Sequence, residues 1–171
     1  MDFYQVIENR QSVRNFDSDK EVSKDILDKI VNAGRVAPSA CNIQPWQFWV
    51  VSSAEMLKKV KECYERDWLN DAPHILIVVG DKDKAWVRSD GYNSVETDAT
   101  IAMDHIILAA ESFGVSTCWI AAFNNLKLRE VLKLSENQKV FAITPLGYSK
   151  DNFEKKDKTP RKSLEEVVKY L

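Results

Sequence analysis

Hydrophobic residues recur along this chain with two different periods, which predict helices and strands in alternation. Positions spaced three and four residues apart indicate helices, and continuous apolar runs of strand length indicate buried strands. Helices are expected over residues 2–9, 23–37, 54–66, 94–113 and 125–134, with one more after Ser163. Strands are expected over residues 46–51, 74–80, 115–121 and 139–149.

Capping residues predict where several of these helices begin. Ser23 can cap the helix over residues 23–37, and the spacings of Ser52 with Glu55 and of Ser163 with Glu166 are typical of a capping box. The core side of the helix over residues 23–37 is expected to consist of Ile26, Ile30, Val31 and Gly34.

The predicted helix over residues 94–113 differs from the others because its apolar residues cover more than one face. We expect it to be buried on several sides, either as a central core helix or as a helix shared between the core and a subunit interface. Pro145 in the last strand and the uneven helix spacing argue against a regular parallel sheet. The pattern alone leaves α/β and α+β folds open.

Composition limits the class of protein. The chain has 171 residues, of which 44% are hydrophobic, and we expect one domain over residues 1–171. Its formal charge is −2, with Lys and Glu interspersed, which does not suggest nucleic-acid binding. No stretch predicts a membrane span, and the first residues lack the pattern of a secretory signal, so we expect a cytoplasmic protein with three reduced thiols.

Few residues are available for acid–base, nucleophilic or metal chemistry. His74 and His105 are the two histidines, and neither has metal-ligand spacing, so no metal site is predicted. A nucleophilic pair of Cys41 with a histidine stays open, although a free cysteine is more often a small buried side chain. The five glycines lie at least eleven residues apart, so they cannot form a glycine-rich phosphate loop. Any bound phosphate must be held by side chains.

The segment NRQSVRNF offers such side chains. Arg10, Ser12 and Arg14 alternate, so in an extended segment they project to one side as two guanidinium groups beside a hydroxyl. These groups suit a phosphate, although the same spacing also fits a solvated basic turn. Lys158 and Arg161 form a second basic group, and the two groups can bind one phosphate only if the chain ends meet in space.

Four motifs follow one another along the chain: NRQSVRNF, AGRVAPSACNIQPWQFWVV, LAAESFGVSTCWIAAF, and TPLGYS with Arg161. Together they span almost the whole sequence, and in this order they resemble the signature of the FMN-dependent nitroreductase family. The resemblance implies an α+β sandwich with a mainly antiparallel central sheet flanked by helices. It also implies an intertwined homodimer with two FMN molecules at the interface.

The resemblance also implies roles for individual residues. Arg10 and Ser12 match the ligands of the FMN phosphate, with Arg161 joining them. Arg14 matches a basic residue at the pyrimidine edge of the flavin ring, where a fixed cation stabilises the negative charge that reduction brings. Ala121 matches the residue whose backbone N–H binds flavin N5. Arg14 and Ala121 are therefore the implied catalytic residues.

The same resemblance implies further FMN contacts. The loop of residues 38–42 matches the loop that reaches the flavin from the partner subunit. The full set of implied FMN-binding residues is Arg10, Gln11, Ser12, Arg14, Pro38, Ser39, Ala40, Asn42, Trp119, Ile120, Ala121 and Arg161.

Three features depart from larger relatives. Ala121 and Ala122 stand where those relatives often have an acidic residue followed by glycine. Relatives often bind the flavin ring edge with a polar residue near Glu65 and Trp68, and Trp68 cannot do so in the same way. The segment VRSDGYNSVE is too short for the helical excursion that covers the pocket in larger members, so we expect open access for substrates.

The implied activity is transfer of hydride from NAD(P)H through flavin N5 to a nitroaromatic, a quinone or a similar electron-poor acceptor. Such a ping-pong mechanism needs no protein nucleophile. Two alternatives stay open. One is a flavoenzyme of the same fold that carries out reductive dehalogenation or flavin cleavage, and the other is a flavin-binding or redox-sensing protein without turnover.

Overall fold

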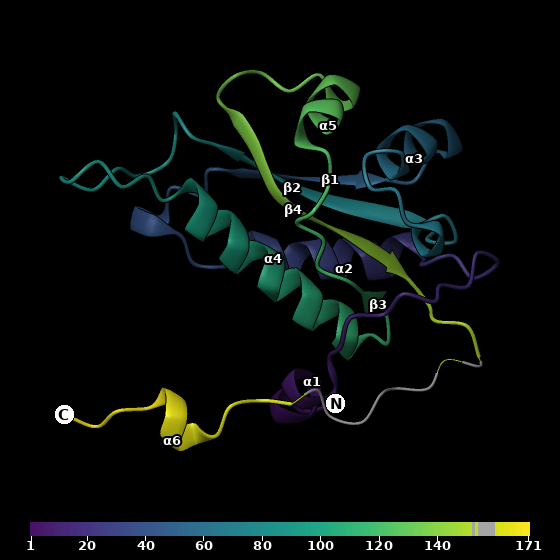
Figure 1. Cartoon of the computed structure of the whole chain (residues 1–171), viewed down its shortest axis with the longest axis horizontal. Helices are drawn as coiled ribbons and strands as arrows, with labels where there is room; N and C mark the ends of the chain where they lie inside the picture. Colours follow the sequence, from purple (N-terminus) through teal and green to yellow (C-terminus); the bar gives the residue numbers. More distant parts are fainter. Residues whose placement is uncertain (152, 154–159) are drawn as a thin grey trace.

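A computed structural model describes residues 1–151, 153 and 160–171. Its centre is a four-stranded sheet in the order β1-β2-β4-β3, and each neighbouring pair of strands is antiparallel (Figure 1). The strands are β1 (Trp46–Val51), β2 (His74–Asp81), β3 (Ser116–Thr117) and β4 (Gln138–Gly147). Antiparallel pairing decides the fold class in favour of α+β and confirms the architecture that the resemblance implied.

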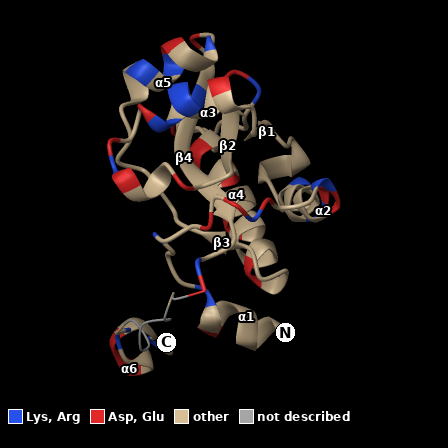
Figure 2. Ribbon diagram, turned by 90° about the vertical axis from the view of Figure 1, so that its right-hand side faces the viewer, with Lys and Arg blue, Asp and Glu red and all other residues tan. Residues whose placement is uncertain are grey.

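Helices cover both faces of the sheet, so the fold has three layers (Figure 2). On one face lie α2 (Lys24–Arg35) and α4 (Val95–Ser112), and on the other lie α3 (Ala54–Lys61) and α5 (Asn125–Leu132). The remaining helical elements are α1 (Phe3–Asn9), η1 (Ala40–Asn42), η2 (Asp67–Leu69) and α6 (Leu164–Val167).

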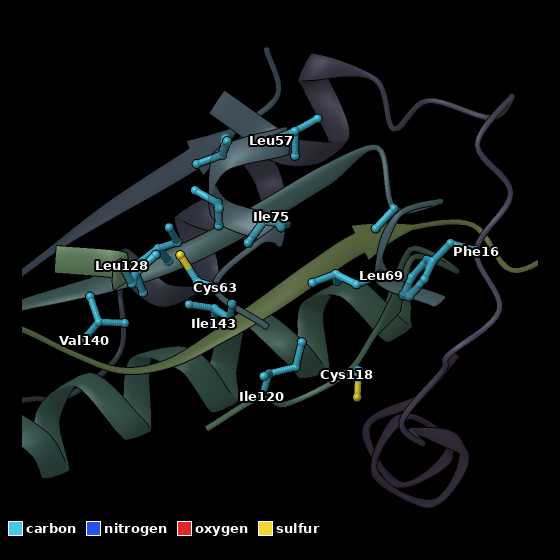
Figure 3. Packing of buried hydrophobic residues seen from close by; sticks show 14 of the residues in the cluster. Phe16, Leu57, Cys63, Leu69, Ile75, Cys118, Ile120, Leu128, Val140 and Ile143 are labelled. Carbon is cyan, nitrogen blue, oxygen red and sulfur yellow. The ribbon is translucent and has the colours of Figure 1, made fainter. Parts of the chain in front are cut away.

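Strand β2 connects two hydrophobic cores. Its side chains alternate between the faces, so Ile75 and Ile77 pack toward α3 and α5 while Leu76 and Val78 pack toward α2 and α4. Figure 3 shows Ile75 among its neighbours Leu57, Leu128 and Ile143. Burial on both faces explains why this strand is a continuous apolar run in the sequence.

Helix α4 is the central helix that its apolar composition predicted. It packs against α2, the sheet and α1, and eight of its residues are buried. Another stripe of the same helix, Ile101, His105 and Leu108, is only half-buried. The contact with α2 is close at Gly34, where an added Cβ would lie 2.6 Å from Ile106 Cδ1.

The buried side of α2 differs partly from the prediction. Ile30 and Gly34 are buried as expected, but the third buried position is Leu27, whereas Ile26 and Val31 are only half-buried. Leu27, Ile30 and Gly34 follow the helical repeat and point at α4.

The predicted helix over residues 54–66 is shorter and begins at a different cap. Ser53, not Ser52, caps α3 by accepting a hydrogen bond from the Met56 N–H, because the Ser52 hydroxyl is hydrogen-bonded to His74 Nδ1 at 2.7 Å. The helix ends at Lys61, where i→i−3 bonds from Cys63 and Tyr64 tighten the chain into a turn. The capping box at Ser163 and Glu166 is confirmed, although α6 has only four residues.

The predicted strand over residues 115–121 pairs regularly only at Ser116 and Thr117. Opposite the next positions, Pro145 has no N–H to donate, and the Cys118 N–H donates to the Thr144 hydroxyl instead of a backbone carbonyl. The chain rejoins the sheet at Ile120, which exchanges two backbone bonds with Ile143. Proline is tolerated in β4 because the neighbouring strand is interrupted there.

None of the helices in the described ranges combines the length and apolarity that crossing a bilayer requires. Within the same residues, His, Cys, Asp and Glu form no group of three or more suited to a metal ion.

Candidate functional site

The segment around Arg10, Ser12 and Arg14 forms an extra edge of the sheet. Ser12 bridges Thr117 of β3 in parallel, and the Val13 N–H donates to the Thr117 carbonyl at 2.8 Å. Val13 is buried, whereas Ser12 is half-buried and Arg14 is exposed. Alternate residues therefore face the core and the opposite side, as extended geometry requires.

The buried thiol of Cys118 follows Thr117, the residue that Ser12 bridges. Burial raises the pKa of Cys118, while the Arg14 charge, the Ser12 hydroxyl and the Arg10 charge lower it in part. Since alternate residues of an extended segment share a side, Arg10, Ser12 and Arg14 lie on the side opposite Val13. In Figure 3 the Cys118 sulfur points away from the core cluster that contains Ile120 and Ile143. The sequence singled out the two arginines and the serine but not this thiol, which no local motif marks.

The residues after β3 continue along the same part of the molecule. Trp119 is 39% exposed and borders a small apolar pit formed with Thr100 and Met103 of α4. Ile120 is buried, and Ala121 is exposed. The Ala121 N–H has no hydrogen-bond acceptor among the described residues. A free backbone donor therefore follows directly on the segment that lies beside Arg10–Arg14.

The loop of residues 38–44 has an unusual backbone. Cys41, Asn42 and Gln44 all have positive φ, at 52°, 55° and 55°. Such values are uncommon outside glycine, and they cluster where a loop is held in shape for a function. The Ser39 hydroxyl accepts a hydrogen bond from the Gln44 N–H at 2.9 Å, which closes the loop on itself.

The two groups of predicted FMN-binding residues lie at opposite ends of α4. Residues 10–14 pair with β3, which follows the last turn of α4, whereas Ala40 is bonded to Asp98 in its first turn. Figure 1 shows η1 and α1 near these two ends of the helix. An 18-residue helix is about 27 Å long. Within one chain the loop and the arginine segment therefore do not converge.

Other predicted residues stand apart from this group. Arg161 is exposed, and no hydrogen bond joins it to Ser12 in the described part of the chain. Gln11, by contrast, lies between Arg10 and Ser12 and is half-buried. Lys158, of the second basic group, lies outside the described residues.

Trp68 belongs to an aromatic group beside the arginine segment. Its ring stacks on Phe16 at 6.2 Å between centroids and meets Tyr64 edge-on at 5.9 Å. Trp68 is half-buried, whereas Glu65 is exposed. The Lys61 ammonium holds the loop that carries Trp68 by donating to the carbonyl of Asn70, and burial lowers the pKa of Lys61.

The short segment between β2 and α4 forms a small hairpin that projects from the body (Figure 1). Val87 bridges Asn93, and Arg88 binds Asp90 through two guanidinium nitrogens while its guanidinium lies 4.8 Å from the Tyr92 ring centroid. The Tyr92 hydroxyl is hydrogen-bonded to Thr97 of α4. These contacts hold the segment as a short hairpin beside the start of α4.

The alternative of a Cys41–histidine pair has no geometric support. His74 is buried and hydrogen-bonded to Ser52, and burial lowers its pKa. Cys41 is exposed in the loop that contacts the first turn of α4, and His105 lies two turns further along that helix. No hydrogen bond joins a thiol to an imidazole within the described residues.

Comparison with known proteins identifies the family. The model of the nitroreductase family matches residues 7–66 and 56–148, which together form most of the chain. This chain belongs to the nitroreductase family. It is therefore an enzyme of the oxidoreductase class.

Three relatives illustrate the match. A protein of Archaeoglobus fulgidus, provisionally named NADH dehydrogenase/NAD(P)H nitroreductase, is 36% identical over 85% of this chain and 84% of its own length. The structure of an FMN-dependent nitroreductase from Clostridium difficile R20291 has a TM-score of 0.82, 30% identity and 98% coverage of both chains. An iodotyrosine dehalogenase 1 homolog of Caenorhabditis elegans is 28% identical over 98% of this chain and 60% of its own length.

Proposed function

We propose that this nitroreductase-family enzyme binds FMN and transfers hydride from NAD(P)H to a nitroaromatic, a quinone or a similar electron-poor acceptor by a ping-pong mechanism. The observation that carries this proposal is the pairing of the Arg10–Arg14 segment with Thr117 of β3, four residues before the free Ala121 N–H. The names of the relatives, which mention NAD(P)H and FMN, agree with it.

The chemistry of these groups fits FMN. The Arg10 guanidinium and the Ser12 hydroxyl suit a phosphate that no glycine-rich loop is available to hold, and Arg161 is proposed to join them. Bound FMN supplies the hydride-accepting and electron-donating chemistry. Arg14 would then place a fixed positive charge at the pyrimidine edge, and the Ala121 N–H would donate a hydrogen bond to N5. Neither role depends on a protein nucleophile.

A homodimer completes the proposed site. The loop of residues 38–42 lies at the far end of α4 from the arginine segment, so it serves as a flavin ligand only for the flavin of a second subunit. Large apolar side chains near both chain ends are exposed: Met1, Phe3, Tyr4, Ile7, Leu164, Val167, Tyr170 and Leu171. The half-buried stripe on α4 adds to them. Apolar surface of this extent is typical of a protein interface.

A second candidate function is reductive dehalogenation. Its support is the iodotyrosine dehalogenase relative, whose match covers 98% of this chain. Both reactions would use the same FMN site, so they differ in the acceptor that enters beside the flavin. The family relatives with nitroreductase names are the more similar ones, at 36% against 28% identity, and nitroreductase chemistry is therefore preferred.

The test is an anaerobic assay of the purified protein with NADH or NADPH and a panel of nitroaromatic, quinone and halogenated aromatic acceptors. We expect turnover that requires FMN and that riboflavin supports poorly, because riboflavin lacks the phosphate. Equal turnover with FMN and riboflavin would remove the phosphate role of Arg10 and Ser12. Release of halide without nitroreduction would favour the second candidate, and no turnover with any acceptor would refute both.

A further inference from the structure

Asp98 is a buried carboxylate in the first turn of α4. It is 2% exposed, although it lies in the most apolar helix of the chain. One oxygen, Oδ1, accepts a hydrogen bond from the Ala40 N–H at 2.9 Å. The other, Oδ2, accepts one from the Ser94 hydroxyl at 2.7 Å, and Ser94 is itself 2% exposed.

These partners are neutral, and no Lys or Arg within the described residues forms an ion pair with Asp98. A buried carboxylate is costly unless hydrogen bonds satisfy its oxygens. The beginning of a long helix also favours negative charge, because its free N–H groups carry partial positive charge. The fold thus accommodates this carboxylate where it can hold the loop of residues 38–44.

The loop of residues 38–44 requires a hydrogen bond to the rest of the protein to keep its backbone shape. Three of its non-glycine residues have positive φ, which persists only where the surrounding structure enforces it. Within the loop, the Gln44 side chain donates to the carbonyl and side chain of Asn42. These bonds shape the loop but do not attach it to the body of the molecule. The bond from Ala40 to Asp98 does attach it, at the start of η1.

We propose that Asp98 is a positioning residue that fixes the loop of residues 38–44 in the shape that contacts the flavin of the partner subunit. This inference rests on the proposed function. It assigns to Asp98 and Ser94 an effect on a flavin that is bound by the arginine segment of the other chain. Asp98 itself does not contact FMN, because its carboxylate faces Ala40 and Ser94 in the interior.

The first test compares FMN affinity among four variants. Asp98→Ala is expected to weaken FMN binding by about 10-fold or more, the usual effect of losing a hydrogen bond to a charged group. Asp98→Asn keeps a carbonyl oxygen for the Ala40 N–H and should stay close to the parent. Ser94→Ala should have an intermediate effect. Asp104→Ala, an exposed aspartate on the same helix, is the matched control and should change nothing.

Thermal unfolding of the same variants without FMN separates positioning from stability. A lower melting temperature for Asp98→Ala with parental FMN affinity would make Asp98 merely structural and overturn the proposal. If Asp98→Ala does not fold, Ser94→Ala and Asp98→Asn carry the comparison, and equal affinity of the Ser94 variant and the parent would overturn it.

Mixed dimers test whether the effect crosses the interface. One chain carries Asp98→Ala, and the other carries Arg10→Ala with Ser12→Ala. The two chains carry different tags, so that mixed dimers can be purified. In each mixed dimer, one site combines the intact arginine segment of the first chain with the intact loop of the second, and the other site is altered in both parts. We expect one FMN per dimer bound with parental affinity. Weak binding at every site would show that Asp98 acts within its own chain and would overturn the proposal.

Loss of the positioning role and loss of the proposed function have different signatures. If the parent protein binds no FMN, the proposed function fails. If the parent binds FMN and Asp98→Ala binds it equally well, only the positioning role fails.

Discussion

Neighbouring residues of the Arg10–Arg14 segment meet opposite environments, and this division produces the candidate site. Val13 is buried under the sheet edge, while Ser12 and Arg14 lie on the opposite side. There they partly offset the rise in the pKa of Cys118 that burial causes. The alternation could be predicted from the sequence because it depends only on extended backbone geometry. The neighbours of Cys118 and the bond from Asp98 to Ala40 could not, since they join residues more than fifty positions apart.

Arg14→Ala should lower the reduction potential of bound flavin by on the order of tens of millivolts, because a fixed cation favours the reduced, more negative ring. Spectroelectrochemical or dye-equilibration titration of the FMN-loaded protein measures this shift. Arg14→Lys retains the charge and serves as the control. A potential equal to that of the parent in Arg14→Ala would exclude the proposed electrostatic role.

Cys41→Ser should keep most of the activity. Cys41 is exposed in a loop that we propose to lie against the flavin, and a serine has nearly the same shape. Steady-state kinetics under anaerobic conditions provide the measurement. Near-complete loss of turnover with FMN still bound would instead establish Cys41 as a nucleophile.

Whole helices and strands follow from the sequence better than their ends do. Hydrophobic periodicity is local, so β2, α4 and the short helix α1 lie where the pattern predicts them. The cap of α3 is Ser53 because His74, distant in sequence, binds Ser52. Likewise, β3 stops early because Pro145 faces it from β4, a pairing that no local pattern reveals.

Gly147→Ala should destabilise the protein by about 1–3 kcal/mol, as overpacking of a closed site generally does. The new Cβ would lie 2.7 Å from Pro73 Cδ and 3.0 Å from Phe16 Cδ1. Both are ring atoms, and Phe16 is fully buried, so neither can retreat easily. Urea denaturation gives the free energy of unfolding, and an unchanged value would show that β4 relaxes at its end without cost.

At the scale of the whole molecule, the two groups of residues that we propose to bind one flavin lie far apart within a single chain. The arginine segment and the loop of residues 38–44 lie at the two ends of α4, and the exposed apolar residues near both chain ends offer surface for a second subunit. The motifs in the sequence suggested both halves of the site. Their separation by a helix becomes apparent only in three dimensions.

The stability of the fold should fall as the pH drops below about 6.5, the ordinary pKa of histidine. Burial lowers the pKa of His74 in the folded state, with Glu21 and the Val22 backbone opposing this in part. The unfolded chain therefore binds a proton first, so the stabilisation is complete above pH 6.5 and is lost as the pH falls toward the lowered pKa. Urea denaturation between pH 5 and 8 measures this.

His74→Gln removes the titrating group and is the control for this pH dependence. Its unfolding free energy should change less than that of the parent between about pH 6.5 and 5, where few carboxylates titrate. Parallel pH profiles of the two proteins would show that His74 contributes nothing to the loss.

We propose that side chains of this nitroreductase-family fold hold FMN where NAD(P)H can reduce it. The most direct test is an anaerobic titration of the FMN-loaded protein with NADH and with NADPH, followed by absorbance of the flavin. We expect that at least one nicotinamide bleaches the bound flavin and that adding a quinone or nitroaromatic restores its colour. Protein that retains no FMN, or bound FMN that stays oxidised under excess NADH and NADPH, would contradict it.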